Sequence, residues 1–190
     1  YKEYCKSLGA AAPDTPYGFY CGIDDNLLIV NHSTGIGTTT HELIHHIVAN
    51  SFRECPQWVN EGFAMFFEKF IGHLDKEGRG VFSVGYFSNW RFPVALEHVD
   101  KVSLRDVVAY REPCSVRSFM LFLHRKGLLK KFILAMPRDG TDADGVRTLV
   151  KVYGKPLEGV EKDWKAWVRA QPVNGEVKLI YYSFFLTATE

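Results

Sequence analysis

The chain has 190 residues, 46% of them hydrophobic and 14% aromatic, which is enough for one domain whose core needs neither disulfides nor a metal ion to fold. Its formal net charge is +1 and it has no run of five or more like charges, so no nucleic-acid partner is indicated. No apolar stretch reaches the roughly 18 residues that a membrane span needs, so we predict no span.

The first elements that the pattern predicts are a lead-in and a β-hairpin. Residues 1–16 are rich in small residues and proline and form the lead-in. Residues 17–21 and residues 27–31 look like two short strands, and the polar turn between them favours a hairpin.

Two helices are predicted next. The first begins near Thr39, which has capping-box spacing to Glu42, and ends between residues 50 and 54. The second has Pro56 in its first turn and runs to about residue 70. Apolar residues form a stripe along the first helix: Leu43, Ile44, Ile47 and Val48.

The rest of the chain is predicted to be mainly helical. Residues 72–89 are rich in glycine and form a loop with a short strand at 81–86. The segment 177–186 is β-branched and aromatic, which is typical of a strand. We expect an α+β fold in residues 17–172, with a small N-terminal sheet packed on the first helix, a mostly helical C-terminal half and a tail of residues 173–190. Helices are predicted at residues 103–108, 113–126, 128–136, 143–153 and 157–170.

The four cysteines, Cys5, Cys21, Cys55 and Cys114, do not form a C-x-x-C pair. A zinc ribbon or a thioredoxin-type site is therefore not expected. The even number permits two disulfides or four thiols, so the sequence leaves the disulfide state and the redox compartment open.

The sequence His41-Glu42-Leu43-Ile44-His45 has the spacing of a metal site on a helix. Residues four apart lie one turn apart on the same face, so His41 and His45 can reach one ion. Zinc accepts imidazole nitrogen, and a catalytic zinc keeps one position for water. Glu42 would stay near the ion and could take a proton from that water. The other interpretation is a chance match, with an ordinary capping glutamate and two unrelated histidines.

A third ligand is indicated by the segment W-V-N-E-G-F-A-M-F-F-E at residues 58–68. Glu61 stands at the start of the second helix, and an antiparallel pair of helices would bring it to the two histidines. A lone glutamate at a helix start is more often a surface residue favoured by the helix dipole. Glu68 lies two turns further on the same face and is either a partner of a ligating histidine or a solvated side chain.

Together the two motifs resemble the gluzincin branch of zinc peptidases, in which two histidines of HExxH and a glutamate on the next helix hold the metal. The chain is similar to small bacterial domains of this kind that carry a Gly-Tyr/Phe-Tyr strand, T-x-x-H-E-x-x-H and P-x-W-x-x-E-G-x-A. The matching residues here are 18–20, 38–45 and 56–64. This resemblance implies a zincin-like fold, with Zn²⁺ held by His41, His45 and Glu61 (the metal ligands) and with Glu42 as the catalytic base.

The sequence departs from this pattern in two respects. Fifteen residues separate His45 from Glu61, fewer than in the large aminopeptidases, so the loop between the helices must be shorter. Such families also supply a tyrosine or histidine from a later helix to stabilise the oxyanion. Tyr110 is the residue we assign to that role, with Arg117 and His124 as other candidates.

The expected activity is zinc-dependent hydrolysis of a peptide bond, with Glu42 activating a water molecule at the metal. The resemblance also implies that a peptide or protein substrate pairs with an edge strand above the metal helix, for which Leu27 to Asn31 is the candidate. No distinct loop with a glutamate precedes His41 to anchor a substrate amine, which favours an endopeptidase. The alternative is a weak or inactive zinc-binding domain with a structural or recognition role in a larger protein.

The sequence leaves the localisation open, with a bacterial extracytoplasmic location slightly favoured. The chain starts at Tyr1 rather than Met and shows no signal peptide, so we expect a fragment or a mature form. It also leaves open the natural substrate, the cleavage specificity, the oligomeric state and the other domains of the parent protein.

Overall fold

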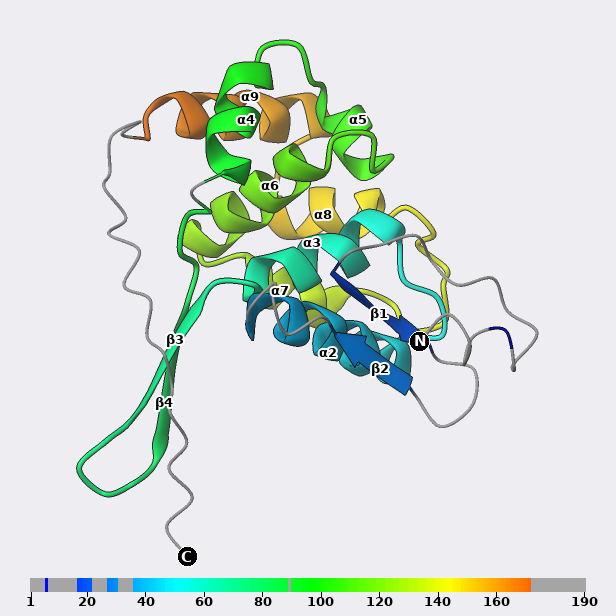
Figure 1. Ribbon diagram of the computed structural model, residues 1–190. Helices are drawn as coiled ribbons and strands as arrows, with labels where there is room; N and C mark the ends of the chain where they lie inside the picture. The colour runs from blue at the N-terminus through cyan, green and yellow to red at the C-terminus, as the bar shows by residue number, and fades with distance from the viewer. Residues whose placement is uncertain (1–5, 7–16, 22–26, 31–35, 89, 172–190) are drawn as a thin grey trace, which may run out of the picture.

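The computed structural model describes residues 6, 17–21, 27–30, 36–88 and 90–171, and the predicted α+β fold is confirmed. In Figure 1 a small hairpin lies beside the first long helix, a second hairpin projects from the body, and the remaining helices pack together. The elements are β1 (Gly18–Cys21), β2 (Leu27–Val30), α2 (Ile36–Ser51), α3 (Gln57–Phe67), β3 (Phe70–Leu74), β4 (Gly80–Val84), α4 (Arg91–His98), α5 (Leu104–Val108), α6 (Pro113–Arg125), α7 (Leu129–Ala135), α8 (Val146–Tyr153) and α9 (Leu157–Arg169).

The N-terminal hairpin is confirmed. Strands β1 and β2 pair antiparallel, with Gly18 opposite Val30 and Cys21 opposite Leu27. Both strands contact α2, and Figure 1 shows them lying along that helix. Within the described residues this sheet has only two strands, so each strand has one edge that pairs with no further strand there.

Helix α2 begins at Ile36, three residues before the predicted start. Thr39 and Glu42 therefore lie inside the helix, and the predicted capping box is wrong. Packing against α3 explains the earlier start. Gly37 lies so close to the end of α3 that a Cβ atom there would be 2.8 Å from the backbone oxygen of Glu68. The hydroxyl of Thr40 adds a hydrogen bond of 3.2 Å to the backbone oxygen of Phe67.

Helix α3 is the centre of the core. Trp58 and Ala64 on this helix are fully buried, and the Trp58 indole donates a hydrogen bond of 2.7 Å to the backbone oxygen of Asp144. Gly62 permits α6 to approach closely, because a Cβ atom there would lie 2.6 Å from the Met120 side chain. Helix α3, which carries the polar residues of the motif, is thus packed between α2 and α6.

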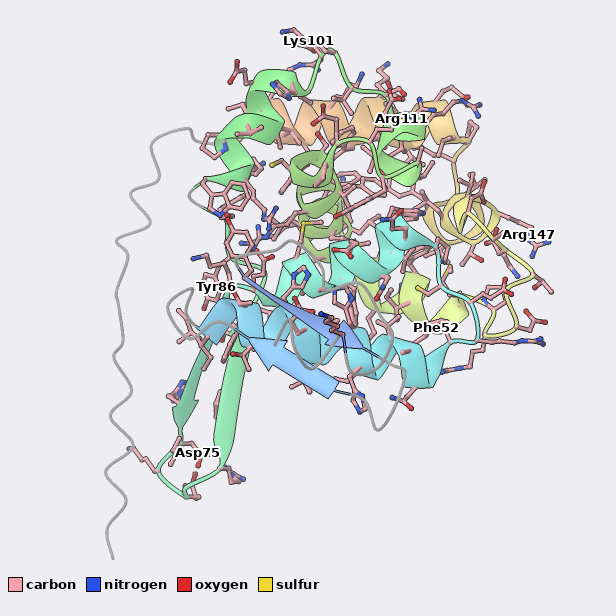
Figure 2. The ribbon with its side chains drawn as sticks, turned by 45° about the vertical axis from the view of Figure 1, so that its right-hand side comes forward. Phe52, Asp75, Tyr86, Lys101, Arg111 and Arg147 are labelled. Carbon is pink, nitrogen blue, oxygen red and sulfur yellow. The ribbon has the colours of Figure 1, made fainter. Side chains whose placement is uncertain are left out.

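The chain between α3 and α4 differs from the sequence prediction. Helix α3 ends at Phe67 rather than near residue 70, and β3 follows at once and pairs antiparallel with β4. The strand predicted at 81–86 is present as Gly80–Val84, whereas β3 was not predicted. Figure 2 shows Asp75 at the tip of this projecting hairpin and Tyr86 where the chain returns to the body.

Helix α4 was not predicted at all, whereas all five later helices are present. Helix α5 begins with a complete capping box between Ser103 and Asp106. Helices α6 and α8 end before Gly127 and Gly154, whose φ angles of 69° and 80° few other residues adopt without strain. Among the described residues, no helix combines the length and the hydropathy needed to cross a bilayer.

Some predictions fall outside the described residues. These are almost all of the lead-in, the last residue of the predicted strand 27–31 and the late strand at 177–186. Cys55 and Cys114 are free thiols, and the side chains of Cys5 and Cys21 are outside the described part. The proposed domain bounds of 17–172 stay a prediction.

Candidate metal centre

His41 and His45 lie one turn apart on the face of α2 that looks toward α3. Their ring centroids are 4.7 Å apart and the ring planes are inclined by 80°. Both side chains are mostly buried, with 16% and 12% of their surface exposed. The spacing of the motif therefore places the two imidazoles together on one face of the helix, as the sequence predicted, and their rings meet edge to face.

Glu61 on α3 completes a group of three donors. Its carboxylate oxygens lie 3.6 Å from His41 Nε2 and 3.7 Å from His45 Nε2, and the donor atoms of all three residues are within 4.8 Å of one another. Donors in tetrahedral geometry around zinc are about 3.4 Å apart, given bonds of about 2.0–2.1 Å. The three side chains therefore fit a single zinc ion with little movement.

Each histidine has a polar partner on the ring nitrogen that faces away from Glu61. His41 Nδ1 is 2.9 Å from Glu68 Oε1, and His45 Nδ1 is 2.9 Å from Asn60 Oδ1. An ionised carboxylate only accepts hydrogen bonds, so His41 donates its Nδ1–H to Glu68, and Nε2 is the nitrogen left for a metal ion. The solvated interpretation of Glu68 is wrong. Asn60 was missed, although it adjoins Glu61 within the same motif.

Glu42 follows His41 on α2 and is buried, with 6% of its surface exposed. The hairpin formed by β1 and β2 covers the same helix. The structure thus brings together His41, His45 and Glu61 and places Glu42 next to this group along the helix. The base role of Glu42 remains a prediction at this point.

A family model described as Peptidase MA superfamily matches residues 11–170, most of the 190 residues. The chain belongs to the Peptidase MA superfamily. No curated protein and no solved structure matches the chain. Proteins of this superfamily bind a metal, typically zinc, and are peptidase-like, so peptides or proteins are the substrate class that membership implies.

His41 and Glu61 shift each other's pKa in this superfamily member. Burial lowers the pKa of His41, but hydrogen bonds and charge from Glu61 and Glu68 outweigh burial and raise that pKa to about 9 in the metal-free protein. Burial raises the pKa of Glu61, and its contacts with His41, His45 and Tyr110 more than reverse this, so the pKa is lowered. The metal-free site therefore holds a proton that a bound cation would replace.

Zinc binding should accordingly depend on pH. Below pH 9 His41 carries a proton that zinc must displace, so we expect the apparent affinity to rise about tenfold per pH unit between pH 6.5 and about 9 and then to level off. Competition with a chromogenic chelator across this range measures the affinity, and proton release in weakly buffered solution gives an independent count. An affinity that stays constant through this window would contradict the proton–metal competition.

Tyr110, the predicted oxyanion donor, lies beside this group. Its hydroxyl is 3.3 Å from Glu61 Oε2. Burial, followed by the charge of Glu61, raises the pKa of Tyr110 well above its ordinary value, so the phenol stays protonated and can donate. Tyr110 is also the one described non-glycine residue with positive φ, at 55°. Such a conformation persists only where surrounding contacts hold it, and it clusters at functional sites.

The two other candidates for the oxyanion role point elsewhere. Arg117 donates hydrogen bonds of 2.8 Å to the backbone oxygens of Met65 and Tyr86 and so ties the end of α3 to the end of the second hairpin. His124 packs on the ring of Phe66, with centroids 5.1 Å apart. Neither side chain is directed to the three donors.

Proposed function

We propose that this chain is a zinc-dependent peptidase of the gluzincin type that hydrolyses internal peptide bonds. One observation carries the proposal, namely the convergence of His41, His45 and Glu61 donor atoms within 4.8 Å in a member of the Peptidase MA superfamily. Glu42 beside them supports a catalytic rather than a structural site, because a structural zinc site closes its fourth position and has no use for a base.

The residues divide the reaction between them. Zinc held by His41, His45 and Glu61 would acidify a water molecule and polarise the scissile carbonyl. Glu42 takes the proton from the attacking water and passes it to the nitrogen of the departing amine. Tyr110 turns its hydroxyl from Glu61 to the carbonyl oxygen and donates a hydrogen bond as negative charge develops there. Attack of the water oxygen forms the new C–O bond. The C–N bond then breaks as its nitrogen receives the proton from Glu42, which releases a carboxylic acid and an amine.

The substrate is proposed to lie along β2. That strand pairs with β1 on one side, and its other edge has no partner strand in the described part of the chain. A peptide added there would run along α2, which both strands contact. Main-chain hydrogen bonds would supply the affinity and make little demand on side-chain identity.

Zinc removal and restoration test the proposal. We expect the zinc-loaded protein to cleave an unfolded protein and peptides blocked at both ends, the chelated protein to be inactive, and one equivalent of zinc to restore activity. Cleavage of blocked peptides distinguishes an endopeptidase from an aminopeptidase. A protein that takes up one zinc ion and cleaves none of these substrates would favour the alternative, a zinc-binding domain with a structural or recognition role.

Tyr110→Phe tests the oxyanion role because it removes the hydroxyl and keeps the ring. The expected result is a fall in kcat of about 10²- to 10³-fold with zinc content retained. Tyr153→Phe is the matched control, since its hydroxyl binds Asp163 at 2.8 Å, away from the site. An unchanged kcat in Tyr110→Phe would remove Tyr110 from the mechanism.

A further inference from the structure

Arg91, the first residue of α4, holds Glu68 with two hydrogen bonds. Its Nη2 is 3.0 Å from Glu68 Oε1 and its Nε is 3.3 Å from Glu68 Oε2. The same Oε1 atom accepts from His41 Nδ1 at 2.9 Å. A continuous chain of contacts therefore runs from α4 through Glu68 to a residue of the metal centre.

We propose that Arg91 is a positioning residue for the metal centre, acting through Glu68 to fix the ring of His41. This inference rests on the proposed metal site, and it concerns zinc binding rather than peptide cleavage. Glu68 belongs to a recognisable motif, whereas Arg91 is 23 residues further on and belongs to none.

The geometry explains why an arginine is suited to this role. Two roughly parallel hydrogen bonds fix the plane of the Glu68 carboxylate, which a single contact would leave free to rotate. A fixed plane keeps Oε1 in line with His41 Nδ1 and so directs Nε2 toward Glu61. About one sixth of each side chain is exposed, 17% for Arg91 and 16% for Glu68, so water competes little for these contacts.

Several contacts fix Arg91 itself. Its backbone N–H donates to Ser88 Oγ at 3.3 Å, and its guanidinium lies 4.1 Å from the centroid of the Trp90 ring. Helix α4 packs on α6, the long buried helix. The nearby Arg117 is held in another position, because its Nε and Nη2 donate to the backbone oxygens of Met65 and Tyr86.

The experiment measures zinc dissociation constants for the full chain by chelator competition at one pH. The variants are Arg91→Ala, Glu68→Ala, the double variant and Arg91→Lys. We expect Arg91→Ala and Glu68→Ala each to weaken zinc binding about 10- to 100-fold. The double variant should lose little more than the weaker-binding single variant, because both residues act along one path. Arg91→Lys keeps the positive charge but lacks the two planar N–H donors, so it should recover the affinity only in part.

A structural role alone would not produce this result, and one further readout and a control variant separate the two cases. Cobalt substituted for zinc should show altered visible absorption in Arg91→Ala, since the ligand field follows the orientation of His41. Arg79→Ala is the control, because Arg79 is 74% exposed and pairs with Asp75 at the tip of the hairpin. Arg91→Lys also serves if the alanine variant does not fold.

Three outcomes would overturn the proposal. One is a zinc affinity and cobalt spectrum of Arg91→Ala equal to those of the wild type, whatever the change in melting temperature. Another is additive losses in the double variant, which would show that Arg91 does not act through Glu68. The third is a wild-type protein without zinc uptake, which would also overturn the proposed function. A wild-type protein that binds zinc without cleaving peptides overturns the proposed function alone.

Discussion

Glu42→Gln should keep its zinc and lose peptide hydrolysis by about 10²- to 10⁴-fold. Glutamine has nearly the shape of glutamate but cannot take a proton from water at neutral pH, so the change removes the base and little else. Glu42 is 6% exposed, and an isosteric replacement leaves no cavity there. The expected change is therefore in kcat, with zinc content measured on the same sample.

Glu97→Gln is the matched control for this variant. Glu97 is an exposed residue of α4, and its replacement changes the net charge by the same amount. It should leave both zinc content and kcat at the wild-type level. If Glu42→Gln kept full activity on a defined peptide, another group would have to be the base, and the proposed mechanism would be wrong.

The candidate metal centre could be predicted because its geometry is almost entirely local. The positions of His41 and His45 follow from the pitch of one helix, and Glu61 follows after one short turn. The residues that position these side chains through hydrogen bonds could be predicted only in part. Glu68 falls on the same helix face as Glu61. Arg91 reaches the site from α4, which follows the β3–β4 hairpin in the sequence. No periodicity in one segment indicates such a long-range contact.

The errors in the fold have a similar origin. The start of α2 is set by the close approach of Gly37 to the end of α3, a tertiary contact that overrides the capping signal at Thr39. Strand β3 begins at Phe70, with only two residues between it and the end of the helical pattern of α3 at Phe67. All of its pairing is with β4, so its own segment does not show that it is a strand. The positive φ of Tyr110 likewise depends on the surrounding contacts and not on its own preference.

Glu61→Ala should weaken zinc binding by about 10³-fold or more, well beyond the 10- to 100-fold expected for outer partners. The change removes the only carboxylate among the three converging donors and leaves two neutral imidazoles to hold a dication. His45→Ala should have a comparable effect, and His46→Ala is its control, because His46 is the next residue on α2 and is not one of those donors. Chelator competition on all four proteins gives the affinities. Zinc held by Glu61→Ala at wild-type affinity would place the third ligand elsewhere, and the gluzincin assignment would lose its main support.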